Sequence, residues 1–201
     1  MLPLAFSAVV AVSGVLGAAD KLPAFKVERW ANSPPLTAEG LRGKVVLIDV
    51  WEYTCINWIR TAPYVKAWHR DYAALGLVVV GLHAPEFEFG KRAGNIDRGV
   101  RDHGLIHPVA FDNDFATWRA LGNDAWPAKY LYDGQGKLVK RFVGEGRYDE
   151  IEGESRQQLI AAKPGIPAQP AAQTSAPMVW RALTAPGCFD WWPARRGDDT
   201  S

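Results

Sequence analysis

The feature that most constrains the fold of this chain is the apolar run VVLIDV at residues 45–50, which follows a glycine turn. A run of this kind suits a β-strand that is buried on both faces, as the strands of parallel sheets are. A second such run, LVVVGL, lies at residues 77–82. Between the two runs, a helix is predicted from apolar residues at roughly helical spacing: Ile56, Ile59, Val65 and Trp68. Pro63 is expected to kink this helix rather than end it.

Shorter elements follow, and they complete the predicted sheet. The pattern predicts a polar helix, a short strand and another helix at residues 93–104, 107–112 and 113–122. Residues 127–146 alternate polar and apolar side chains around a glycine-rich turn at 133–136, which is typical of a β-hairpin. A closing helix is predicted at 148–162. Strand–helix–strand connections favour parallel neighbours and the hairpin adds an antiparallel edge. The expected fold class is therefore α/β, with a central mixed sheet and helices on both faces.

The N-terminus differs from this central pattern. Residues 2–16 are almost wholly apolar and small residues follow, so residues 1–19 resemble a signal peptide cleaved after Ala19. No Lys or Arg precedes the run, and the alternatives are an uncleaved membrane anchor or a buried N-terminal helix. Export implies an oxidising extracytoplasmic compartment, the periplasm in a bacterium. Contact with a membrane is expected only if the segment stays uncleaved.

The C-terminus also changes character. Residues 20–162 hold the predicted folded domain, whereas residues 163–201 are a Pro- and Ala-rich linker followed by a Trp-containing tail. The linker lacks any helix or strand periodicity, and the whole segment is expected to be flexible.

Charge and cysteine content exclude several classes of function. The net charge is +1 and no basic block occurs, so nucleic acid is not an expected partner. The two cysteines, Cys55 and Cys188, are too few for a disulfide framework. His103 and His107 lie four apart, but the HGLIHP segment that holds them is no helix face, and no metal site is expected.

Cys55 is the candidate nucleophile. It follows the first buried strand and begins the predicted helix, and the sites of open α/β sheets gather beyond the carboxyl ends of parallel strands. A helix N-terminus offers unpaired N–H groups and the positive end of the helix dipole, and both stabilise a thiolate. The alternative from position alone is an inert cysteine buried at a strand end.

Further candidate residues are expected at the same edge of the sheet. His83 and Glu86 follow the second strand and are candidate proton-transfer groups, or else solvated loop residues. Pro127 precedes the hairpin, where a proline lies either at a strand start or in a cis turn that presents backbone to a ligand. Three tryptophans complete the set expected around the thiol: Trp51, Trp58 and Trp126.

Residues 45–158 resemble the thioredoxin-like domain of the DipZ group of cytochrome c biogenesis proteins, within the TlpA-like, redoxin-type thiol–disulfide oxidoreductases. The motifs that carry the resemblance occur in order: Y-T-C-I-N, R-T-x-P-Y-x-K-A-W, H-x-P-E-F, D-N-D-x-A-T-W, W-P-A-K-Y-L and G-E-G-x-Y-D-E. The resemblance implies an extracytoplasmic thioredoxin-like domain over residues 20–162, a nucleophilic Cys55 and a cis Pro127. It also implies a groove for the peptide backbone of a protein substrate, or a low-molecular-weight thiol or disulfide, and no metal or organic cofactor.

One departure from the family changes the expected chemistry. The family motif is C-I-N-C, whereas this chain has C-I-N-W, so Trp58 stands in place of the resolving cysteine. Cys55 can still enter a mixed disulfide, but release then needs an external thiol reductant, a second substrate thiol, or Cys188, whose surroundings in the sequence show no activating charge. Trp58 either covers the thiol, offers an aromatic face to a substrate, or simply fills space. Glu52 is a second departure, because a carboxylate this close disfavours a thiolate.

Three functions compete. The leading interpretation is an exported thiol–disulfide oxidoreductase-like protein that uses Cys55 alone, so that exchange is lost in Cys55→Ser and kept in Cys188→Ser. The second is a catalytically degenerate binding module that holds an extended peptide. The third, a peroxiredoxin-type peroxidase, is disfavoured because the P-x-x-x-T-x-x-C arrangement is missing around Cys55.

Overall fold

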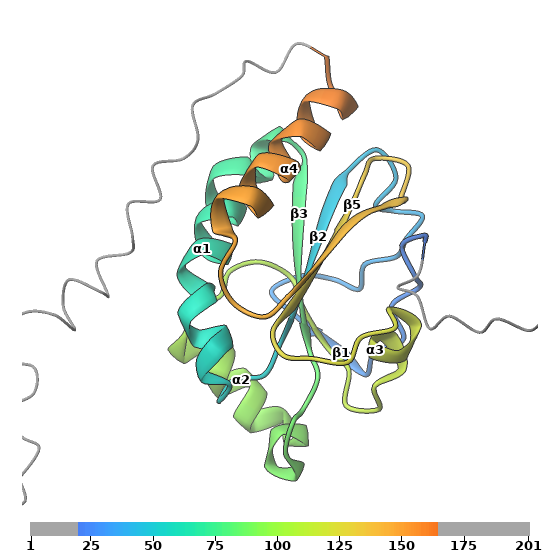
Figure 1. Cartoon of the computed structure of the whole chain (residues 1–201). Coiled ribbons are helices and arrows are strands. Elements are labelled where there is room, and N and C mark those ends of the chain that lie inside the picture. Colours follow the sequence, from blue (N-terminus) through green and yellow to red (C-terminus); the bar gives the residue numbers. More distant parts are fainter. Residues whose placement is uncertain (1–19, 165–201) are drawn as a thin grey trace, which may run out of the picture.

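The computed structural model describes residues 20–164, which form one layered α/β unit (Figure 1). The predicted signal peptide and nearly all of the predicted tail, with Cys188, lie outside the described residues. The strands are β1 (Arg29–Ala31), β2 (Val45–Trp51), β3 (Leu77–His83), β4 (Val109–Phe111), β5 (Ala128–Tyr132) and β6 (Leu138–Val143). The helices are α1 (Ile56–Tyr72), α2 (Ala93–Asp102), α3 (Ala116–Ala120) and α4 (Tyr148–Ala162), with 3-10 turns η1 (Ala73–Leu75) and η2 (Glu88–Lys91).

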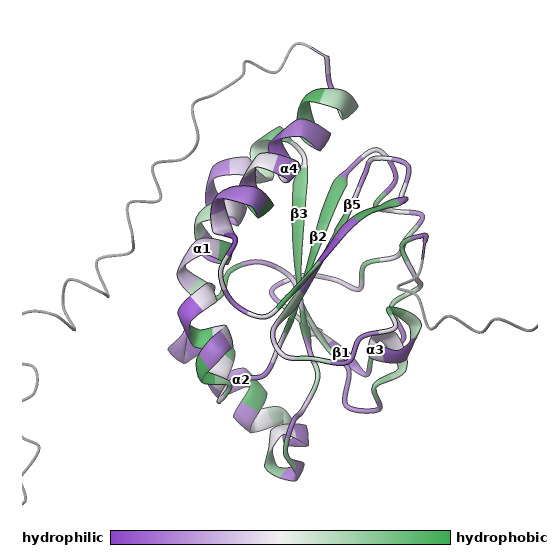
Figure 2. Cartoon of the chain, viewed as in Figure 1, coloured by the Kyte–Doolittle hydropathy of each residue, from purple (hydrophilic) through white to green (hydrophobic). Residues whose placement is uncertain are grey.

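The strands form one six-stranded mixed sheet in the order β1-β4-β3-β2-β5-β6. β2 and β3 pair in parallel, as do β3 and β4, because helical crossovers join them. β5 pairs antiparallel with β2, and β6 extends that edge as the second strand of the hairpin. Every residue of β2 is buried, and the central strands are among the most hydrophobic parts of the molecule (Figure 2). The predicted mixed sheet is confirmed.

Helices cover both faces of the sheet, as predicted, but the two faces are covered differently. α1 and α4 pack on one face, where Val65 and Leu159 join a core with alternate residues of β2 and β3 (Figure 1). On the other face lies the short helix α3 together with the segment that precedes β2, from which Phe25 and Leu41 pack on the sheet. That segment is therefore part of the cover of the core.

Two local details explain where elements start and stop. The helix predicted at 113–122 is shortened to α3, because the Asp112 carboxylate accepts hydrogen bonds from the backbone N–H groups of Thr117 and Trp118 at 3.2 and 2.7 Å. In the hairpin turn, Asp133 Oδ1 accepts hydrogen bonds from the N–H groups of Gln135 and Lys137.

None of the helices within residues 20–164 is both long enough and apolar enough to cross a membrane.

Candidate thiol site

Cys55 lies at the N-terminal end of α1, one turn beyond the carboxyl end of β2. It is the N-cap residue, with an extended backbone (φ −67°, ψ 108°), and its side chain makes no capping hydrogen bond. Its N–H donates to the carbonyl of Glu52 at 3.2 Å, which closes the turn between strand and helix. The side chain is a free thiol and is partly exposed. The thiol is thus presented at a helix N-terminus and can be reached from solvent.

Trp58 is buried completely, one helical turn beyond Cys55. Its ring packs on Trp51 with the ring centroids 4.4 Å apart, and its Nε1 donates a hydrogen bond of 2.8 Å to Asp49 Oδ2. A fully buried ring presents no face to a substrate. The structure thus excludes the role in which Trp58 offers an aromatic face to a substrate, and Trp51 is equally buried.

An ion pair lies deep beneath this site. Asp49 on β2 and Lys129 on β5 face each other in the register of the two strands, with Oδ1 and Nζ 3.2 Å apart and both side chains almost fully buried. Lys129 Nζ also lies 3.4 Å from Thr61 Oγ1 of α1. We call Trp51, Trp58, Asp49 and Lys129 the buried floor of the site. Sequence reasoning missed the pair, although a single acid in VVLIDV and a single base in AKYLY were the signals.

His83 does not reach the surface as a proton-transfer group would. It ends β3 with its ring fully buried between Trp51 and Tyr53, at centroid distances of 4.9 and 5.9 Å. Burial lowers the pKa of His83 to about 3, so the imidazole is neutral at physiological pH. Neither ring nitrogen has a hydrogen-bond partner among the described residues. His83 therefore supports the turn before Cys55 from within.

Trp126, Pro127 and Glu86 lie at the same edge of the sheet as Cys55. The Trp126–Pro127 peptide bond is cis, and the next residue, Ala128, pairs with Val50 near the carboxyl end of β2. Trp126 Nε1 donates to the carbonyl of Ala84 at 3.0 Å and thereby ties the hairpin entry to the loop after β3. Glu86 is an exposed residue of that loop. The fold brings these segments to one edge of the sheet, but the Trp126 ring packs on Trp118 of α3, with the ring centroids 4.3 Å apart, and belongs to the core on the other face rather than to the one beside Cys55.

The turn before Cys55 and the loop after β3 carry aromatic side chains that the sequence analysis did not single out. Tyr53, Phe87 and Phe89, here called the aromatic ledge, contact one another: Phe87 and Phe89 stack at 5.3 Å, and Phe89 meets Tyr53 edge to face at 6.1 Å. Phe87 and Phe89 remain 50% and 43% exposed. The signal for the ledge was the F-E-F run beside the H-x-P-E-F motif.

Glu52 contacts both the turn before Cys55 and the loop after β3 that carries Phe87 and Phe89. Its side chain is fully buried; Oε2 accepts a hydrogen bond of 2.7 Å from the N–H of Thr54, and Oε1 has no hydrogen-bond partner among the described residues. A Cβ at Gly90 would lie 3.4 Å from Oε1 and 3.0 Å from Pro85 Cβ, so the loop approaches Glu52 closely. Burial first, and then the nearby Glu52 charge, raise the pKa of Tyr53.

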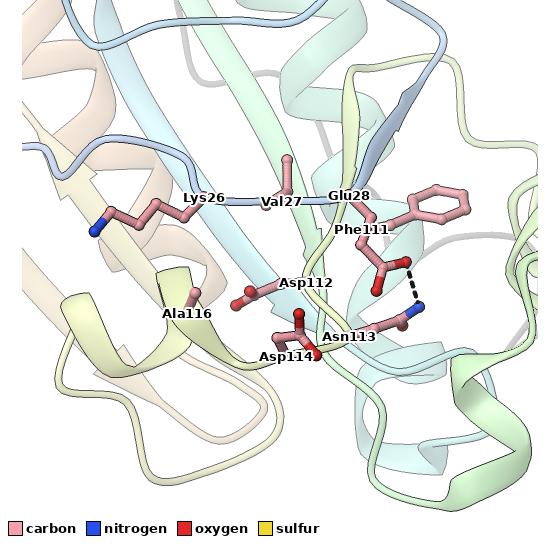
Figure 3. Close-up of a pocket in the computed structure, with 8 residues that line it drawn as sticks. All are labelled: Lys26, Val27, Glu28, Phe111, Asp112, Asn113, Asp114 and Ala116. Atoms are coloured by element: carbon pink, nitrogen blue, oxygen red, sulfur yellow. Dashed lines mark hydrogen bonds between the residues drawn. The ribbon is translucent and has the colours of Figure 1, made fainter.

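A separate cavity of about 350 Å³ opens beside the end of β4 (Figure 3). Acidic and amide side chains point into it, and Asn113 Nδ2 donates to Glu28 Oε2 at 2.9 Å. Both carboxylate oxygens of Asp112 already accept backbone N–H groups of α3. None of the predicted site residues lines this cavity. Within residues 20–164, no group of three or more His, Cys, Asp or Glu side chains is arranged to hold a metal ion.

Comparisons with known proteins agree with this geometry. No protein-family model matches the chain. The chain is 43% identical over 164 residues to the protein DipZ of Mycobacterium tuberculosis, a match that covers 80% of this chain and 24% of DipZ. It is 27% identical over 113 residues to the thiol-disulfide oxidoreductase ResA of Bacillus anthracis, covering 56% of this chain and 62% of ResA. The chain thus spans about a quarter of the length of DipZ.

Solved structures support the same assignment. The solution structure of a thioredoxin-like protein in its oxidized form matches with a TM-score of 0.64 and 26% identity, over 74% of this chain and 99% of that chain. The chain therefore belongs to the thioredoxin-like, redoxin-type family.

Proposed function

We propose that this protein carries out thiol–disulfide exchange with Cys55 as its one nucleophile. The Cys55 thiolate attacks a substrate disulfide, a new S–S bond joins Cys55 to one substrate sulfur, and the other sulfur leaves as a thiolate with its electron pair. An external thiol, or a second thiol of the substrate, then attacks the mixed disulfide and frees Cys55. The substrates are protein disulfides or low-molecular-weight thiols and disulfides.

One observation carries this proposal: Cys55 is a partly exposed thiol at a helix N-terminus, while the neighbouring resolving position is filled by the fully buried Trp58. The first half of a dithiol cycle needs only the exposed thiol. The second half needs a nucleophile that Trp58 cannot supply. Isomerisation, deglutathionylation-like exchange and capture are the reactions that remain.

The test is exchange with oxidised glutathione, followed by intact mass. We expect Cys55→Ser to form no adduct and Cys188→Ser to form the same Cys55 adduct as the unaltered chain. Adduct formation that survives Cys55→Ser would overturn the proposal. The rate at which iodoacetamide alkylates the Cys188→Ser chain at pH 7 should at least equal that of N-acetylcysteine.

The exposed aromatic ledge favours a second candidate, a thioredoxin-fold binding module without catalysis. In that case, Cys55 would stay unmodified at neutral pH until denaturant is added, while peptides still bind. The alkylation experiment separates the two functions.

We also propose that the protein acts outside the cytoplasm. The apolar residues 2–16 and the small residues up to Ala19 support this location, in which residues 1–19 direct export and residues 20–162 form the working domain. Fractionation of the source cells, with the mass of the purified chain, tests the location and the cleavage after Ala19. Recovery of the uncleaved chain in the cytosol would contradict it.

A further inference from the structure

We propose that Glu52 is a positioning residue that makes Cys55 a capture site. Glu52 holds the turn that presents the thiol, and its buried negative charge makes the Cys55 sulfur a slow leaving group, so that a mixed disulfide formed there persists. This role rests on the exchange function proposed for Cys55, and it determines how long the covalent intermediate lasts.

Glu52 is hydrogen-bonded to the two residues that lead into α1. Its carbonyl oxygen accepts the N–H of Cys55 at 3.2 Å. Its Oε2 accepts the N–H of Thr54 at 2.7 Å, and the Thr54 hydroxyl donates to the same oxygen. Cys55 makes no side-chain capping bond of its own, so these contacts of Glu52 hold the turn in which the thiol is presented.

The Glu52 carboxylate lacks a counter-charge. Its side chain is fully buried, and among the described residues Oε1 has no hydrogen-bond partner and no cation forms an ion pair with it. The buried Asp49, three residues earlier, is by contrast paired with Lys129 at 3.2 Å. Burial first, and after it the Glu52 charge, raise the pKa of Tyr53, so the charge acts on the turn between Glu52 and Cys55.

The cations around this turn do not cancel the charge of Glu52. Lys91 and Arg98 are exposed, and each is already paired with an acid of its own helix, at 2.8 and 3.7 Å. Arg92 is exposed too, and Arg92 and Arg98 each affect the pKa of Tyr53 less than Glu52 does. Exposed charges are screened by salt, whereas a buried charge is screened much less.

Two imidazoles also face Tyr53. His83 stacks on its ring, and burial lowers the pKa of His83 to about 3, so His83 adds no positive charge at neutral pH. His103 Nε2 lies 3.2 Å from the carbonyl oxygen of Tyr53. Measurement at pH 8, above the ordinary range of imidazoles, keeps the protonation of both out of the comparison.

The charge should slow release more than capture. In capture, the Cys55 thiolate attacks a substrate disulfide, and a less stable thiolate is scarcer but more nucleophilic, so the two effects partly offset each other. In release, an external thiolate attacks the substrate sulfur, the S–S bond to Cys55 breaks, and Cys55 departs as a thiolate with the electron pair. A nearby carboxylate disfavours that thiolate, and this step has no such offset. Trp58 supplies no thiol that could replace the external one.

The experiment measures release with glutathione. The full chain carrying Cys188→Ser is converted by oxidised glutathione into the mixed disulfide at Cys55, the excess is removed, and reduced glutathione is added at pH 8. Attack on the bound glutathione sulfur frees Cys55 and forms oxidised glutathione. Attack on the Cys55 sulfur exchanges one glutathione for another and leaves the mass unchanged. The intact mass of acid-quenched samples therefore reports only the step in which Cys55 is the leaving group.

Glu52→Gln keeps the size of the side chain and an oxygen for the Thr54 N–H, but it removes the charge. We expect it to release glutathione about threefold faster than the parent, and its alkylation by iodoacetamide should rise at lower pH. Thr54→Val removes one hydrogen bond of the turn and keeps the charge, so it should accelerate release clearly less. Glu152→Gln is the matched control, because it removes another buried carboxylate, bonded to Tyr72 at the far end of α1, and it should change neither readout.

The outcomes separate the role of Glu52 from the proposed function. A release rate for Glu52→Gln equal to or below that of the parent, or an equal acceleration in Thr54→Val, would overturn the role of the charge while leaving exchange at Cys55 intact. If neither the parent nor any variant takes up glutathione, although N-acetylcysteine does so under the same conditions, the exchange function itself is absent. Glu52→Met, which is similar in size and places no amide in the buried position, repeats the comparison if Glu52→Gln fails to fold.

Discussion

The buried floor and the aromatic ledge each hold an aromatic residue close to Cys55 in the chain, Trp58 and Tyr53, yet they differ in how far their rings are buried. In the floor, Trp51 and Trp58 are fully removed from water, and the indole N–H of Trp58 is satisfied by the Asp49 carboxylate. In the ledge, Phe87 and Phe89 keep about half of their surface in water. Apolar area that is buried on folding stabilises the fold, whereas area left exposed is available to a partner. The floor should therefore govern stability and the ledge should govern recognition.

Loss of the floor's ion pair should give the largest effect. Lys129→Met leaves the Asp49 carboxylate buried without its counter-charge, which should lower the free energy of unfolding by about 3–5 kcal/mol. Lys140→Met is the matched control, because Lys140 forms exposed ion pairs with Glu150 and Glu154 and should change stability little. Urea unfolding of both variants measures the contrast. Equal losses would show that burial does not distinguish the two pairs.

A cysteine in place of Trp58 should lower the free energy of unfolding somewhat less than Lys129→Met does, and it should give Cys55 a partner for a disulfide. Trp58→Cys removes a large buried ring and should lower stability by about 3 kcal/mol. It also recreates the C-x-x-C spacing at the start of α1, so mild oxidation should join the two sulfurs, and intact mass should show the loss of two hydrogens. Trp68→Cys removes another buried ring farther along α1 and should be destabilised without forming the bridge. A bridge in both variants would point to scrambling after unfolding.

Acidification should destabilise the fold through two buried histidines: His107, and His83, whose ring lies between Trp51 of the floor and Tyr53 of the ledge. Burial lowers the pKa of His83 to about 3, and burial followed by the charges of His69 and Lys66 lowers that of His107 to about 3. Below the ordinary pKa of about 6.5, the unfolded chain binds protons at these imidazoles and the folded chain does not. Stability is therefore full above pH 6.5 and falls towards pH 3, by about 1.4 kcal/mol per pH unit for each imidazole.

Urea midpoints between pH 7 and 5 measure this slope. His107→Gln, whatever its own stability, should roughly halve the contribution of the two imidazoles to the slope, because one of them no longer titrates. A slope that His107→Gln leaves unchanged would mean that other groups set the acid response.

The ledge should give the smallest effect on stability. Phe87→Ser/Phe89→Ser removes rings that are already half in water, so the free energy of unfolding should change by less than about 0.5 kcal/mol in excess of the change in Ile160→Ser, a control at an exposed apolar residue of α4. Thermal and urea unfolding measure this difference. A loss as large as that of Trp58→Cys would show that the ledge contributes to the folding core, and the contrast between ledge and floor would be wrong.

Most of the framework could be predicted from the sequence because its patterns are local. The apolar runs at 45–50 and 77–82 mark β2 and β3, and the Gly-rich turn at 133–136 marks the hairpin. The position of Cys55 at the start of α1 followed from the same strand-to-helix junction. The start of α3 was missed by a few residues, because the Asp112 carboxylate accepts hydrogen bonds from the N–H groups of Thr117 and Trp118 from a position before the helix.

The sequence by itself determined the strand and helix order, the thiol at the end of β2, and the absence of a second cysteine at the next turn of α1. Only the tertiary structure decided which polar and aromatic groups are buried and which remain exposed. Trp58 and Phe87 are both large aromatic residues, but Trp58 is fully buried and Phe87 is 50% exposed. Their difference depends on the residues packed around each ring: Trp58 packs on Trp51 and donates its hydrogen bond to Asp49, whereas Phe87 stacks on Phe89 and stays half exposed. Burial is a property of the packed layers, and no local pattern contains it.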